Sequence, residues 1–104
     1  MNLKLSLSGN VLCAALMGEL DEHSAADVRK KLDDALRDPD ITRVVFDMRS
    51  VTFMDSSGIG VILGRCRRLN ERGGSMNVIN ASRSVDKVLR ISGVYKLCSE
   101  RSGR

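Results

Sequence analysis

Hydrophobic and polar residues alternate at the beginning of the chain. Leu3, Leu5 and Leu7 are separated by single polar residues, and after a Gly-Asn pair the apolar stretch 11–17 follows. A period of two is typical of a β-strand with one buried face, and a Gly-Asn pair favours a tight turn. The pattern therefore predicts that the chain opens as a β-hairpin.

The segment after this hairpin has the spacing of an amphipathic helix. Its apolar residues recur three or four positions apart, and Ser24 with Asp27 resembles a capping box at its start. The pair Asp38-Pro39 indicates that the helix ends nearby. The apolar face consists of Val28, Leu32, Ala35 and Leu36.

A short run rich in β-branched and aromatic residues comes next, at 44–46. Such a continuous run is typical of a central strand covered on both faces, so we expect it in the middle of a sheet. A second helix should begin after the segment 55–58 and end at Gly73-Gly74. Its apolar face would contain Ile59, Ile62, Leu63, Cys66 and Leu69.

The rest of the chain predicts three further elements. Residues 76–79 read as a strand, and either Ser82 or Ser84 begins a helix that ends at Gly93. A final short strand is expected at 94–97.

The predicted order is therefore ββαβαβαβ. Strands that alternate with helices favour parallel pairing with right-handed crossovers, while the opening hairpin adds an antiparallel edge. We expect an α/β fold with one mixed, mostly parallel sheet packed against helices. The length of 104 residues fits a single domain spanning 1–104.

Composition excludes several classes of protein. No apolar run approaches the roughly 18 residues of a membrane span, and the N-terminus lacks a signal-peptide core, so we expect a cytoplasmic protein with no membrane partner. The net charge of +4 could attract an acidic partner, but scattered basic residues and three aromatics argue against nucleic acid. Cys13, Cys66 and Cys98 are widely spaced, which predicts reduced, buried thiols.

The segment with the most chemistry is Asp55-Ser56-Ser57-Gly58. It places two hydroxyls and a carboxylate at a strand-to-helix junction, where unpaired backbone N–H groups can hold an anion. A phosphate on Ser56 would be compatible with the positive end of the helix dipole. Taken alone, the segment is more typical of a structural role, in which Ser56 or Ser57 is the N-cap and Asp55 is a turn residue.

Three blocks of sequence give this segment a context. They are Gly18-Glu19-Leu20-Asp21, the stretch 53–64 that reads FMDSSGIGVILG, and Ile91-Ser92-Gly93-Val94. With these blocks the chain resembles the anti-sigma factor antagonists of the STAS family, most of all those that act in sporulation in endospore-forming bacteria. The resemblance covers almost the whole chain.

The resemblance implies a partner switch that regulates transcription. The unmodified antagonist would bind an anti-sigma factor that is also a serine/threonine protein kinase, and so release the sigma factor. Phosphorylation of Ser56 by that kinase would end the binding, and a phosphatase of the serine/threonine class would reverse it. The residues expected to contact the partner are Asp21, Asp55, Ser56, Ser57, Gly58, Ile59 and Gly60.

Other members of the family suggest alternative functions. The chain could be a scaffold subunit of a stress-response complex, or the small cytoplasmic component of a lipid transporter.

Enzymatic functions find little support in the sequence. The glycines at 58, 60 and 64 do not have the spacing of a dinucleotide loop, and no phosphate-binding loop occurs. His23 has no nucleophile-elbow context and reads as a solvated loop residue. The acidic group Glu19, Asp21 and Glu22 lacks the spacing of a cation loop. We therefore expect no catalytic residue, metal or cofactor.

The polar side of the second predicted helix carries a row of basic residues. Arg65, Arg68 and Arg72 would either meet an acidic partner or simply be solvated.

Overall fold

The computed structural model describes residues 1–97 and begins with the predicted hairpin. Strands β1 (Asn2–Ser8) and β2 (Val11–Leu20) pair antiparallel, with Leu5 opposite Ala14. Gly9 has a φ of 61°, a left-handed conformation that glycine adopts without strain, which is why the chain can reverse there. The hairpin prediction is confirmed.

Two parallel crossovers complete a four-stranded mixed sheet. Helix α1 (Ala25–Ala35) leads to β3 (Arg43–Met54), and helix α2 (Ser56–Glu71) leads to β4 (Ser75–Ile79). The strand order is β1-β2-β3-β4, with β3 parallel to both of its neighbours. The mixed sheet and the internal position of β3 are therefore confirmed.

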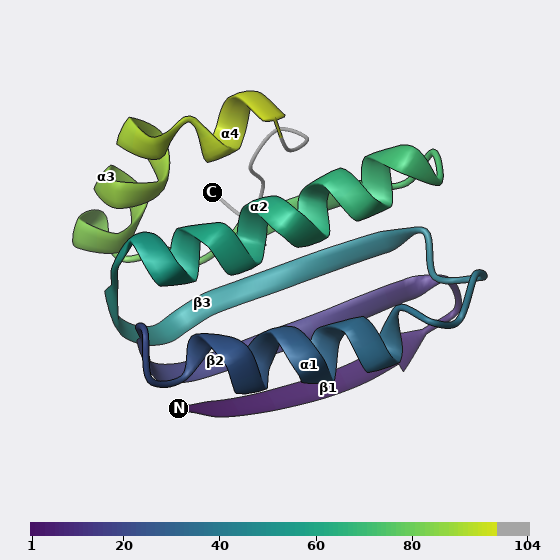
Figure 1. Cartoon of the computed structure of the whole chain (residues 1–104), viewed down its shortest axis with the longest axis horizontal. Coiled ribbons are helices and arrows are strands. Elements are labelled where there is room, and N and C mark those ends of the chain that lie inside the picture. Colours follow the sequence, from purple (N-terminus) through teal and green to yellow (C-terminus); the bar gives the residue numbers. More distant parts are fainter. Residues whose placement is uncertain (98–104) are drawn as a thin grey trace.

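The helices α1 and α2 cover only one face of this sheet (Figure 1). In β3, Val44, Phe46 and Met48 are buried, whereas Val45 is half-buried and Arg49 is exposed. The expectation that β3 is covered on both faces is wrong. Successive strands are added in one direction, so right-handed crossovers place both connecting helices on the same side.

The last predicted strand is also wrong, because residues Val94–Leu97 form a short helix, α4. Gly93 ends α3 (Arg83–Ser92) in the left-handed conformation, with a φ of 82°. The chain then turns, buries Val94 and packs against α2 and α3 instead of reaching the edge of β4. Asn70 Nδ2 donates to the carbonyl of Leu97 over 3.1 Å. A segment of four residues is too short for periodicity to separate helix from strand.

The basic row on α2 joins parts of the chain to one another. Arg65 Nε lies 3.0 Å from Asp33 Oδ1 as an ion pair, and Arg68 Nη1 donates to the same oxygen over 3.1 Å. Burial lowers the pKa of Arg65, while the charge of Asp33 opposes this effect. Arg72 donates to three backbone carbonyls that follow α1, those of Leu36, Asp38 and Ile41. These arginines therefore hold α2 to α1 and to the loop before β3.

The helix caps differ in part from the predictions. Ser24 is the N-cap residue of α1, but its side chain caps no N–H and donates to the carbonyl of Glu19 over 2.8 Å, so the predicted capping box is absent. Ser82, not Ser84, caps α3 by accepting from the N–H of Val85.

Cys13 and Cys66, the cysteines within residues 1–97, are free thiols in two different settings. Cys66 is buried, as expected, whereas Cys13 is only half-buried because it lies on the uncovered side of β2. Cys98 and the polar tail 99–104 lie outside the described residues.

Candidate functional site

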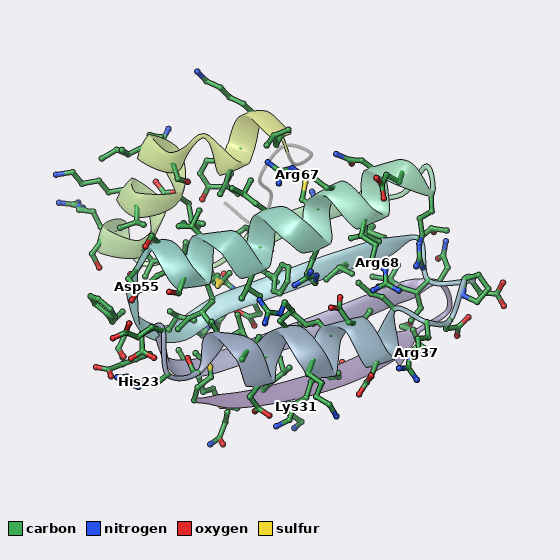
Figure 2. All side chains as sticks on the ribbon, in the orientation of Figure 1. His23, Lys31, Arg37, Asp55, Arg67 and Arg68 are labelled. Carbon is green, nitrogen blue, oxygen red and sulfur yellow. The ribbon has the colours of Figure 1, made fainter. Side chains whose placement is uncertain are left out.

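The candidate site lies where the parallel strands end and their helices begin. The backbone N–H of Asp55 donates to the carbonyl of Leu20 over 3.3 Å, which joins the end of β3 to the end of β2. Asp21 and Ser56 follow these two residues directly, so they share one edge of the sheet. Figure 2 shows Asp55 and His23, from the two connecting loops, at the same end of the molecule.

Asp55 is the N-cap of α2. Its Oδ1 accepts from the N–H of Ser57 over 2.9 Å and from the N–H of Gly58 over 3.3 Å, and its carbonyl accepts the first helical bond, from Ile59. A carboxylate in this position satisfies two donors that the helix leaves open and complements its dipole. The structural alternative, in which Ser56 or Ser57 is the cap, is therefore wrong.

The two serines differ in accessibility. Ser56 is the first residue of α2 and is exposed, whereas Ser57 is half-buried. Within the described part of the chain, the hydroxyl of Ser56 forms no hydrogen bond. Ser56 therefore presents a free hydroxyl at the surface.

The two glycines that follow have opposite surroundings. Gly58 is buried, and a Cβ built there would lie 2.7 Å from the carbonyl oxygen of Leu20 and 2.9 Å from the Cγ of Met54. Gly60 is exposed, and a Cβ there would meet nothing within 4 Å. Gly58 thus lets α2 pack closely against the sheet, while Gly60 leaves an exposed position on the helix without a side chain.

An apolar groove of about 410 Å³ opens beside Ser56, between the N-terminal end of α2 and α3. Its rim includes Ile91, which at 75% is the most exposed large apolar residue in the described part of the chain. Sequence reasoning missed the α3 side of this groove. The signal available was Ile91, an apolar residue outside the periodic face of α3. The lining residues are Met54, Asp55, Ser56, Ile59, Val88, Ile91 and Ser92.

Asp21 lies at the same edge but lines a different, more polar hollow at the β2–α1 loop. Its Oδ1 accepts from the N–H groups of His23 and Ser24, over 2.9 and 3.1 Å. Partial desolvation raises the pKa of Asp21, but these hydrogen bonds outweigh it and hold the pKa below its ordinary value. His23 is an exposed loop residue, as predicted, 3.8 Å from Glu22.

Within residues 1–97, no group of three or more His, Cys, Asp or Glu side chains is arranged to hold a metal ion. No helix among the same residues is long and apolar enough to cross a membrane.

Comparison with known proteins places this chain in a family. Residues 2–100 match the STAS domain. The anti-sigma F factor antagonist of Paenibacillus polymyxa is 38% identical over 99 residues, which cover 93% of this chain and 85% of the relative. The structure of the anti-sigma factor antagonist SpoIIAA in its unphosphorylated form superposes with a TM-score of 0.75 at 31% identity, covering 86% of this chain and 83% of that one. The phosphorylated form of the Bacillus cell fate determinant SpoIIAA gives a TM-score of 0.76 at 29% identity, covering 97% and 92%. The chain belongs to the STAS domain family.

Proposed function

We propose that this protein is an anti-sigma factor antagonist, active in sporulation, whose binding to a kinase that is also an anti-sigma factor is controlled at Ser56. The observation that carries the proposal is the free, exposed hydroxyl of Ser56 on the rim of an apolar groove. The names of its relatives support the same role. The protein would act in the cytoplasm as a phosphate acceptor and binding partner, not as an enzyme.

The chemical step belongs to the partners. With ATP bound to the kinase, the Oγ of Ser56 attacks the γ-phosphorus, the bond to the β–γ bridging oxygen breaks, and ADP leaves. The hydroxyl proton passes to a base on the kinase. A phosphatase of the serine/threonine class reverses the modification by directing water at the phosphorus, which returns the serine hydroxyl and inorganic phosphate.

The phosphate would stop binding by changing the surface of the groove. It adds a charge of about −1.5 to −2 beside an apolar groove whose exposed residue Ile91 a docking partner would cover. Covering an unpaired charge requires removing its water, which is costly without compensating bonds. The unmodified hydroxyl carries no such charge. Addition of one phosphate therefore opposes association while leaving the fold in place.

We expect the kinase to place one phosphate on Ser56 and none on Ser57, since Ser56 is exposed and Ser57 is half-buried. The measurement is peptide mapping by mass spectrometry after incubation with the anti-sigma factor kinase of the same organism and ATP. A phosphate on Ser57 alone would contradict the assignment. Recovery of a large scaffold assembly or a membrane transporter from cell extract, instead of a kinase, would contradict the proposed function.

The groove makes a second prediction, at Ile91. Replacing its exposed side chain by serine should weaken kinase binding by about tenfold, because burying a large apolar side chain contributes about 1.5 to 3 kcal/mol and about 1.4 kcal/mol corresponds to a factor of ten. The matched control is Leu7→Ser, which changes an apolar side chain that is 55% exposed on the hairpin, outside the groove. Affinities are measured by calorimetric titration with nucleotide present. Equal losses in both variants would show that the groove has no special role.

A further inference from the structure

The beginning of α2 is already occupied by a carboxylate. Oδ1 of Asp55 accepts from the N–H groups of both Ser57 and Gly58, at 2.9 and 3.3 Å. Open N–H groups at a helix start are the place where a phosphate would otherwise settle. A phosphate on Ser56 would therefore lie beside N–H groups that already donate to Asp55, and beside the negative charge of the Asp55 carboxylate.

Asp55 is also the charged neighbour that such a phosphate would meet in the groove. Apart from Ser56 itself, the other described lining residues are Met54, Ile59, Val88, Ile91 and Ser92, none of which carries a charge. If the N–H groups of Ser57 and Gly58 were open, a phosphate could bend back and accept from them. Its oxygens would then be partly satisfied and withdrawn from the surface.

We propose that Asp55 is a positioning residue of the switch, which keeps a phosphate on Ser56 outside the helix end and over the groove. This inference rests on the proposed function. In that position the phosphate blocks the docking surface and stays open to the phosphatase, in whose reaction water adds to phosphorus, the Oγ–P bond breaks and the serine oxygen regains a proton. The carboxylate thus serves both the inhibition and its reversal.

The test is Asp55→Asn in protein that carries phosphoserine at position 56, installed during translation. Asn caps helices about as well as Asp, so the fold should persist while the charge is removed. The second pKa of phosphoserine is about 6, and a neighbouring carboxylate raises it. We expect phosphorus NMR to show this pKa lowered by roughly half a unit or more in the variant.

The matched control is Asp34→Asn, which also removes one negative charge, but near the C-terminal end of α1 and away from Ser56. Asp34 lies 3.6 Å from Arg37, and Figure 2 places Arg37 and Asp55 at opposite ends of the molecule. This variant should leave the phosphate pKa unchanged. Because the phosphoserine is installed without a kinase, these results stand even if the proposed function fails.

Two further readouts separate positioning from a simple loss of charge. In Asp55→Ala, which removes the acceptor that caps these donors, the amide protons of Ser57 and Gly58 should move downfield as the phosphate loses its second proton, clearly further than in the parent protein or in Asp55→Asn. A broad-specificity serine/threonine phosphatase should remove the phosphate several-fold more slowly from Asp55→Ala than from the parent protein. Equal phosphate pKa values in the parent protein and Asp55→Asn, equal amide shifts in all three proteins, or equal dephosphorylation rates would each overturn the inference.

Discussion

Ser56→Asp is expected to weaken kinase binding by about 30- to 150-fold, which corresponds to roughly 2 to 3 kcal/mol. The new carboxylate stands on the rim of the apolar groove, and a docked partner would have to strip its water. The variant should remain folded, because the cap of α2 is Asp55 and an acidic residue in the first helical turn is compatible with the dipole.

Ser56→Ala is the matched variant. It also lacks the hydroxyl that accepts phosphate, but it keeps the rim neutral, so it should bind like the parent protein and resist inactivation. Since Asp55 provides the cap, alanine at position 56 removes no capping bond. Calorimetric titration of both variants against the kinase, with melting curves for each, checks the prediction. Equal affinity of the two folded variants would rule out a charge-gated interface at Ser56.

Gly58→Ala should lower the free energy of unfolding by about 2 kcal/mol, because overpacking a tight contact costs roughly 1 to 3 kcal/mol. The added Cβ would lie 2.7 Å from the carbonyl oxygen of Leu20, and backbone cannot move aside easily. For a domain of this size the melting temperature should fall by roughly 8 to 15 °C. Thermal unfolding followed by circular dichroism measures the change.

Gly60→Ala tests the same substitution two residues away, where a Cβ meets nothing within 4 Å. In the interior of a helix, alanine is favoured over glycine by about 1 kcal/mol, so this variant should melt a few degrees higher than the parent. If Gly60 also lies under the docked partner, as the resemblance implies, the more stable variant should bind the kinase less tightly. Equal melting temperatures of Gly58→Ala and Gly60→Ala would contradict the difference in packing between these two glycines.

The elements that could be predicted from the sequence are those with a strong period or a clear turn residue. Leu3, Leu5 and Leu7 identified the hairpin, and Gly73-Gly74 identified the end of α2. The error at Val94–Leu97 has a physical cause, since the burial of Val94 against other helices decided the conformation of a segment too short to decide it locally.

The candidate site could be predicted only in its continuous part. Residues 55–60 are adjacent in the chain, and their motif, together with the family resemblance, predicts a functional role for Ser56. The α3 wall of the groove comes from Val88 and Ile91, some thirty residues later, and depends on how α3 packs beside α2. The hydrogen bonds of Arg72 could not be predicted from the sequence either. Its three acceptors are backbone carbonyls, which every residue carries, so the sequence does not mark them.

The free hydroxyl of Ser56 has a consequence for the speed of the proposed switch. Because that hydroxyl forms no hydrogen bond within the described residues, adding a phosphate breaks no contact that must later be rebuilt. We therefore expect the proposed switch to need no slow rearrangement of this chain, so that its response time would follow the rates of the kinase and the phosphatase.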